Sequence, residues 1–182
     1  MRTTLAFLAG VAVTVVVTVG GAFAWHEYAG HRPGAAATVS SAPLSADLRF
    51  TGLDGRTHTL GEWRGKLLLI NFWATWCGPC REEIPFLTQA QQRYGAHGLQ
   101  VIGPAVDDPA AVTREKATLG IGYPIMVGTP ESMMNLMETL GNERGGIPFS
   151  VLVAPDGRVL LRQLGEFKPA ELEALIKHNL PG

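Results

Sequence analysis

The stretch KLLLINFWATWCGPC, residues 66–80, decides the fold because it joins a long apolar run to the only two cysteines of this 182-residue chain. A continuous apolar run such as residues 66–73 is typical of a central strand that is covered on both faces. After Pro79, apolar residues recur at helical spacing as far as Gly95, where a glycine favours the end of a helix. The sequence therefore predicts a buried strand that passes into a helix, with the cysteines at the junction.

The rest of the chain alternates in the same way. The pattern predicts a hairpin, then strand and helix twice, and then a closing hairpin followed by a helix. These elements are expected at residues 48–60, 98–106, 109–120, 123–128, 130–141, 149–165 and 169–179. We expect an α/β domain with a mixed central sheet flanked by helices.

Composition limits the classes of function. The chain is 46% hydrophobic and 17% charged, so it can bury a core of ordinary size. Its formal net charge is -1 and it contains no run of Lys or Arg. A nucleic-acid-binding protein needs a basic surface, so we exclude that class.

The amino-terminal segment is typical of a membrane-spanning helix or a signal peptide. Residues 5–25 carry no charge and number 21, enough for a helix to cross a bilayer of roughly 30 Å. Arg2 precedes them, which by the positive-inside tendency places the rest of the chain outside the cytoplasm. The Ala-Phe-Ala at residues 22–24 equally suits a cleaved signal peptide. Both interpretations predict export.

Changes in composition along the chain predict its domain organisation. Residues 1–25 form the predicted anchor or signal peptide. Residues 26–45, rich in Ala, Gly, Ser and Pro, form a flexible linker, and residues 46–182 form the folded domain.

Cys77 and Cys80 admit three interpretations. As a structural disulfide they would close a loop too short to stabilise the fold much. As half of a zinc site they lack a second pair of Cys or His ligands. As a redox pair they benefit from the helix amino terminus, whose N–H groups favour the thiolate of Cys77.

Two motifs resemble those of the thioredoxin superfamily. FWATWCGPC, residues 72–80, resembles its active-site signature, and GGIPFSVLVAPDGRVL, residues 145–160, resembles its second signature. The export segment, linker, opening hairpin and an inserted stretch at residues 106–127 narrow the resemblance to the membrane-tethered TlpA/ResA/CcmG-like branch. It implies a thioredoxin-like fold with an amino-terminal hairpin extension and a central insert.

The resemblance also implies roles for the residues around the cysteines. Cys77 would be the exposed nucleophile that attacks a substrate disulfide, and Cys80 the buried thiol that resolves the mixed disulfide. Gly78 and Pro79 form the insert associated with reducing thioredoxins. Trp76 would belong to the exposed rim.

The second signature implies a substrate-binding role for Ile147 and Pro148. Pro148 matches the family's cis-proline, whose loop packs against the disulfide. The backbone of Ile147 would then pair with an extended substrate segment.

Two polar positions concern the proton of Cys80. Thioredoxins carry a buried Asp six residues before the first cysteine, and Asn71, which cannot titrate, stands there. The tethered branch often has a Glu three residues after the second cysteine, and Glu83 stands there. We expect Glu83 to relay that proton, with a pKa raised by burial, and Glu82 to face solvent. In the alternative, both are surface carboxylates stabilised by the helix dipole.

Four methionines, Met126, Met133, Met134 and Met137, raise the question of copper binding. Met133 and Met137 are one helical turn apart, but this spacing is more typical of core packing. We expect no metal site and no cofactor. A copper metallochaperone that binds the metal through the two cysteine thiolates is the alternative function.

The function that the resemblance implies is an exported protein-disulfide reductase on the periplasmic side of the bacterial inner membrane, anchored by residues 5–25. Its partners would be an extracytoplasmic protein with a disulfide and a membrane thiol-electron donor. Apocytochrome c cysteines or the cysteines of an oxidase copper site are the expected substrates.

Overall fold

A computed structural model describes residues 42–181, and a seven-stranded sheet runs through its centre in the order β2-β1-β5-β4-β3-β6-β7. The strands are β1 (Arg49–Gly52), β2 (Thr57–Thr59), β3 (Leu67–Phe72), β4 (Leu99–Pro104), β5 (Ile125–Val127), β6 (Phe149–Val153) and β7 (Val159–Leu164). The helices are α2 (Gly78–Tyr94), α3 (Pro109–Thr118), α4 (Pro130–Thr139) and α5 (Pro169–Asn179), with short 3-10 turns at η1 (Leu60–Trp63) and η2 (Gly95–His97). The predicted sequence of elements is confirmed.

The sheet is mixed, as expected. Strands β3, β4 and β5 are parallel neighbours, whereas β6 and β7 are added antiparallel on one side. The hairpin of β1 and β2 is added antiparallel on the other side, where β1 pairs with β5. The insert at residues 106–127 therefore supplies the strand that connects the opening hairpin to the rest of the sheet.

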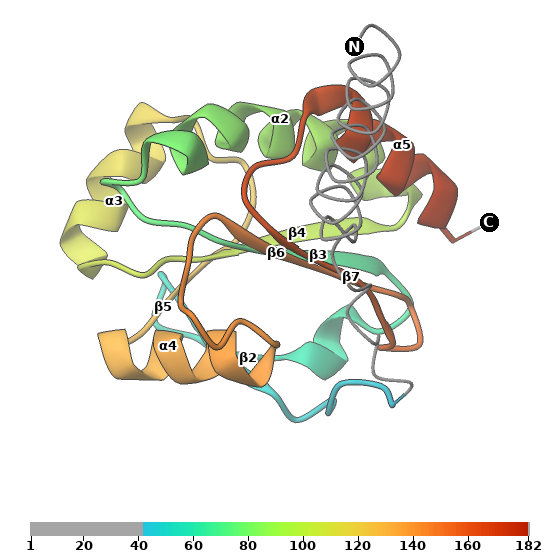
Figure 1. Ribbon diagram of the computed structural model, residues 1–182, viewed down its shortest axis with the longest axis horizontal. Helices are drawn as coiled ribbons and strands as arrows, with labels where there is room; N and C mark the ends of the chain where they lie inside the picture. The colour runs from blue at the N-terminus through green and yellow to red at the C-terminus, as the bar shows by residue number, and fades with distance from the viewer. Residues whose placement is uncertain (1–41, 182) are drawn as a thin grey trace, which may run out of the picture. The chain divides into compact units, whose positions relative to one another are not determined.

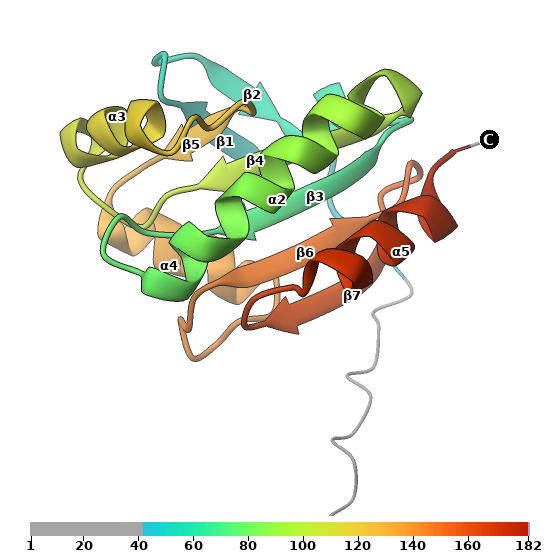
Figure 2. The ribbon, with the colours of Figure 1, turned by 90° about the horizontal axis from the view of Figure 1, so that it is seen from above.

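Helices cover both faces of the sheet. Helices α2, α3 and α5 lie on one face and α4 lies on the other (Figures 1 and 2). The side chains of β3 alternate accordingly: Leu67 and Leu69 join the apolar cluster under α2, whereas Leu68 and Ile70 join the cluster beside α4. All six residues of β3 are buried, which explains its continuous apolar run.

The end of α2 differs in detail from the expectation. The helix does end before Gly95, but Gly95 keeps right-handed helical dihedral angles and the chain continues into η2. The left-handed conformation that favours glycine occurs at Gly98, whose φ is 97°. The chain leaves the helix through one further 3-10 turn before it enters β4.

The predicted anchor and most of the linker lie outside the described residues. Leu44, expected in the linker, already contacts the domain: its N–H donates to the Gly157 carbonyl at 2.9 Å, and its carbonyl accepts from Arg64 at 2.8 Å. Contacts thus begin two residues before the predicted domain start at Ala46. Across residues 42–181, no helix combines the length and the apolar character that a membrane span requires.

The methionines of the central sheet and α4 are mostly core residues. Met126 and Met137 are fully buried and Met133 is 5% exposed, and all three pack in the cluster on the α4 face. Met134, in contrast, is 41% exposed. The packing interpretation is confirmed for the three buried side chains.

Met137→Ala should lower the free energy of unfolding by about 2–5 kcal/mol, because it leaves a cavity in a fully buried site. Met134→Ala is the control and should change it by no more than about 0.5 kcal/mol, because that side chain is partly in solvent. Urea denaturation of both oxidised variants measures the difference. Equal effects would contradict the assignment of Met137 to the core.

Candidate active site

The two cysteines form a disulfide at the start of α2. Their Cα atoms are 5.3 Å apart, and Cys77 is the N-cap residue of the helix. The Cys80 N–H donates to the Cys77 Sγ atom at 3.3 Å. The strand-to-helix junction therefore directs the Cys80 N–H at the sulfur of Cys77, an arrangement that favours a thiolate once the disulfide is reduced.

The exposure of Cys77 corrects one expectation. The resemblance implied an exposed nucleophile, but Cys77 is only 5% exposed, against 1% for Cys80. Both cysteines belong to the apolar cluster under α2, and Ile147 packs against this cluster. The disulfide is thus nearly covered by its neighbours, although Cys77 keeps the larger exposed fraction.

The other rim residues lie at the surface, as expected of a rim. Trp76 is 70% exposed, and Gly78 and Pro79 are exposed as well. A Cβ atom added at Gly78 would meet nothing within 4 Å. The two positions that flank Cys77 are therefore open to a partner.

The second signature lies at the same end of the sheet. Phe149 of β6 pairs with Phe72 of β3, so the residues just before β6 lie beside the end of β3, where the cysteine-bearing turn begins. The Ile147–Pro148 peptide bond is cis, as the resemblance implied. Pro148 is buried and Ile147 is partly exposed.

A buried carboxylate lies one helical turn beyond Cys80. Glu83 is 1% exposed, so it is not a surface carboxylate, whereas Glu82 is exposed as predicted. The Asn71 side-chain amide donates to Glu83 Oε2 at 3.0 Å, and the Phe167 N–H donates to Oε1 at 2.7 Å. Residues i and i+3 share one side of a helix, so Glu83 and Cys80 face the same interior.

The network continues to Ser150, which sequence reasoning missed. The Asn71 amide also donates to the Ser150 hydroxyl at 2.9 Å, and these two residues face each other across β3 and β6. The sequence did contain a signal for a buried polar role, because Ser150 is the one polar residue in the apolar strand FSVLV. Asn71 thus uses its amide to hold the carboxylate rather than to titrate.

Burial raises the pKa of Glu83, because it disfavours the ionised form, and the negative charge of Glu166 acts in the same direction. The hydrogen bonds from Phe167 and Asn71 offset part of this increase. The phenol of Tyr123, also buried, has a pKa raised by burial and by the charge of Glu83. Tyr123 was not singled out from the sequence, because a Tyr in an apolar stretch suggests packing alone.

The alternative function, copper binding through the two thiolates, would need a further ligand beside the cysteines. Among residues 42–181, no group of three His, Cys, Asp or Glu side chains is placed to hold a metal ion. The buried methionines lie in the cluster on the opposite face of the sheet from Cys77 and Cys80, so these three side chains are not placed to supply that ligand.

Comparison with known proteins agrees with this geometry. Residues 36–176 match the Redoxin family model. The chain is 30% identical over 148 residues to the thiol-disulfide oxidoreductase ResA of Geobacillus kaustophilus (strain HTA426), a match that spans 81% of this chain and 80% of the relative.

Solved structures point the same way. A thiol:disulfide interchange protein of the thioredoxin family from Chlorobium tepidum TLS superposes with a TM-score of 0.67 at 30% identity, over 81% of this chain and all of that one. A protein from Chlorobium tepidum described as a putative thiol:disulfide interchange protein DsbE gives a TM-score of 0.64 at 28% identity, over 77% of this chain and 95% of that one. The fold is therefore thioredoxin-like.

Glu83 should make the stability of the oxidised protein depend on pH. Because the folded-state pKa is raised, the folded protein binds this proton more tightly than the unfolded chain. Its stabilising contribution is present below the ordinary Glu pKa and is lost as pH rises through the raised pKa. Glu83→Gln should remove this loss.

Urea denaturation of wild type and Glu83→Gln between pH 4 and pH 8 measures the effect. The free energy of unfolding of the variant should rise relative to wild type as the pH increases. Glu82→Gln, altered at the exposed neighbour, should parallel wild type. A pH-independent difference between Glu83→Gln and wild type would contradict the raised pKa.

Proposed function

This chain belongs to the Redoxin family and is a thiol-disulfide oxidoreductase, and from that premise we propose that it reduces disulfides in proteins outside the cytoplasm. The observation that carries the proposal is the disulfide at the start of α2 with the buried Glu83 carboxylate one turn beyond it. Such a pair can exchange electrons with a protein disulfide, and the carboxylate can hold the proton that the exchange displaces.

The reaction begins at Cys77. In the reduced protein its thiolate, favoured by the helix N–H groups, attacks one sulfur of a substrate disulfide. A mixed disulfide forms between Cys77 and that sulfur, and the other substrate sulfur leaves as a thiolate that takes up a proton. The small exposed fraction of Cys77 is enough for this attack, because one substrate sulfur has to approach the Cys77 sulfur from only one direction.

The second step belongs to Cys80 and Glu83. Cys80 loses its proton to the Glu83 carboxylate and attacks the Cys77 sulfur, which releases the second substrate sulfur as a thiolate. Two electrons have then passed from the protein to the substrate, and of the two protons that the substrate thiolates take up, Cys80 has released one and solvent supplies the other. The pair ends as the disulfide, and Glu83 returns its proton to solvent or to the departing thiolate.

The rim supplies the substrate-binding surface. Trp76, Gly78 and Pro79 provide exposed surface on both sides of Cys77, and an extended segment of the substrate pairs with the backbone of Ile147 beside Pro148. The support for these roles is that both loops lie at the same end of β3.

The cellular setting follows from the amino-terminal segment. Residues 5–25 anchor the domain to the periplasmic side of the bacterial inner membrane, or direct its export as a cleaved signal peptide. An oxidising compartment leaves the pair oxidised after each turnover, so a membrane thiol-electron donor must reduce it again. The substrates are cysteines that need to be reduced before they receive haem or copper, as in an apocytochrome c or an oxidase copper site.

The reduction potential of the Cys77–Cys80 pair tests the direction of the chemistry. In the full-length protein equilibrated with thiol redox buffers, we expect a value near that of thioredoxin, about -270 mV. Thiol labelling followed by mass spectrometry measures the reduced fraction. A value near that of DsbA, about -120 mV, would show an oxidant instead.

Glu83→Gln tests the proton relay. It should slow the reduction of a protein disulfide such as that of insulin by about a hundredfold or more, because the general base is lost. The wild-type rate should fall as the pH drops through the raised pKa of Glu83, and the variant should lack this fall. Glu82→Gln is the matched control, and an unchanged pH profile in Glu83→Gln would rule out the relay.

A further inference from the structure

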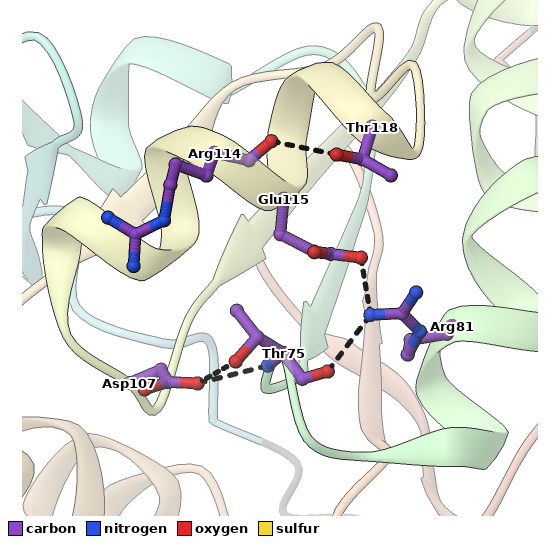
Figure 3. Close-up of polar contacts among 6 residues, drawn as sticks. All are labelled: Thr75, Arg81, Asp107, Arg114, Glu115 and Thr118. Atoms are coloured by element: carbon purple, nitrogen blue, oxygen red, sulfur yellow. Dashed lines mark hydrogen bonds and ion pairs between the residues drawn. The ribbon is translucent and has the colours of Figure 1, made fainter.

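The turn that precedes Cys77 is held at Thr75 by the side chains of Asp107 and Arg81, and Glu115 in turn holds Arg81 (Figure 3). The Thr75 N–H donates to Asp107 Oδ2 at 3.1 Å, and the Thr75 hydroxyl donates to the same oxygen. Arg81 donates to the Thr75 carbonyl at 3.2 Å and forms an ion pair with Glu115. All three polar groups of Thr75 are therefore engaged.

These contacts of Thr75 link the cysteine-bearing turn to the insert, residues 106–127. Asp107 lies between β4 and α3, and Glu115 belongs to α3, so both carboxylates come from residues 106–127. Arg81 directly follows Cys80 in α2, and its N–H donates to the Cys77 carbonyl at 3.1 Å. The insert thus contributes to the surroundings of the active site as well as to the sheet.

One peptide unit connects Asp107 to Cys77. The Ala74–Thr75 peptide donates its N–H to Asp107, and its carbonyl accepts from the Cys77 N–H at 3.2 Å. Two hydrogen bonds on the same peptide unit polarise each other. The two bonds and the peptide between them place the carboxylate at most about 9 Å from the Cys77 amide.

The charged cluster of Asp107, Arg81 and Glu115 holds an excess of negative charge. The hydrogen bonds to Asp107 from the Thr75 hydroxyl, the Asp108 N–H and the Thr75 N–H outweigh the effect of its partial burial, and they hold its pKa below the ordinary value. Asp107 is therefore ionised at neutral pH. Glu115 is paired with Arg81, whose guanidinium is always protonated, whereas Asp107 is bound to Thr75 and to the Asp108 N–H. The formal charges of Asp107, Glu115 and Arg81 sum to -1.

We propose that Asp107, Arg81 and Glu115 are positioning residues that set the redox poise of the Cys77–Cys80 pair: they clamp Thr75 and keep a net negative charge beside the Cys77 thiolate. This inference rests on the proposed role of Cys77 as the nucleophile. The helix start favours the thiolate, and the cluster opposes it. Because a stabilised thiolate makes a pair more oxidising, as in DsbA, the cluster keeps this pair reducing.

Other charged groups surround the start of α2. Glu83 is buried beneath it, and Glu82, Glu166 and Lys168 lie near Glu83. Arg114 of α3 is exposed, and Figure 3 draws no hydrogen bond or ion pair from its guanidinium to Asp107 or Glu115. These groups stay unchanged in every variant below, so their contribution cancels in the comparison.

Three charge-neutralising variants with preserved shape test the proposal. Asp107→Asn and Glu115→Gln each remove a negative charge, and both should lower the pKa of the Cys77 thiol and make the pair more oxidising. Arg81→Gln removes the positive charge and should do the reverse. Asp108→Asn is the matched control, since Asp108 caps α3 without contacting Thr75 and Asn caps helices equally well.

The expected size follows from Coulomb's law. Unit charges about 10 Å apart change an equilibrium constant by about twofold at the dielectric constant of water and by more than tenfold at the effective value of about 20 near a protein surface. The pKa of Cys77, from the pH dependence of its alkylation in the reduced full-length protein, should shift by about half a unit or more. At a pH above that pKa, a threefold change in the equilibrium with glutathione corresponds to about 14 mV.

The opposite signs separate redox tuning from a merely structural role. Loss of packing would move all three variants in the same direction, and that outcome would overturn the proposal, as would shifts no larger than that of Asp108→Asn. If Asp107→Asn fails to fold by circular dichroism, Glu115→Gln against Arg81→Gln still decides the sign. A wild-type protein that cannot reduce insulin would instead refute the proposed function.

Discussion

The burial of β3 on both faces is the constraint on which the rest of the structure depends. A strand in the middle of a sheet with helices on both sides must be apolar along its whole length, and Leu67 to Phe72 meet this condition except at Asn71. The chain can leave such a strand only at its end, where it turns directly into α2. The cysteines occupy this turn, so the helix start, the start of β6 and the insert all meet beside the disulfide.

The polar residues inside this apolar setting mark the chemistry. Asn71, Glu83 and Ser150 are each at most 1% exposed, and burying such groups is unfavourable unless they are hydrogen-bonded. Each of them has a partner, yet the carboxylate still has a raised pKa because its surroundings are apolar. A thioredoxin-like protein that carries Asn71 can therefore place its titrating group on the helix instead of the strand, one turn beyond Cys80.

Sequence reasoning succeeded where the signal is local. Strand burial and helix termini depend on neighbouring residues, so local sequence predicted them. The signals were the apolar run of β3, the glycine after α2 and the prolines that open α3, α4 and α5. It failed where distant segments meet. The contacts of Ser150 with Asn71 and of Asp107 with Thr75 join residues 32 to 79 positions apart, and the raised pKa of Tyr123 depends on burial, so no spacing rule predicts them.

The sequence by itself determined the succession of strands and helices along the chain and the place of Cys77 and Cys80 at a helix start. It also carried the family resemblance that selected Glu83 and Pro148 as candidate site residues. These features follow from local periodicity and from short motifs. Only the tertiary structure decided that Cys77 is nearly covered, that Glu83 is buried against Asn71, and that the insert reaches Thr75. Burial and charge at the site depend on which elements pack together, and that is a property of the folded chain.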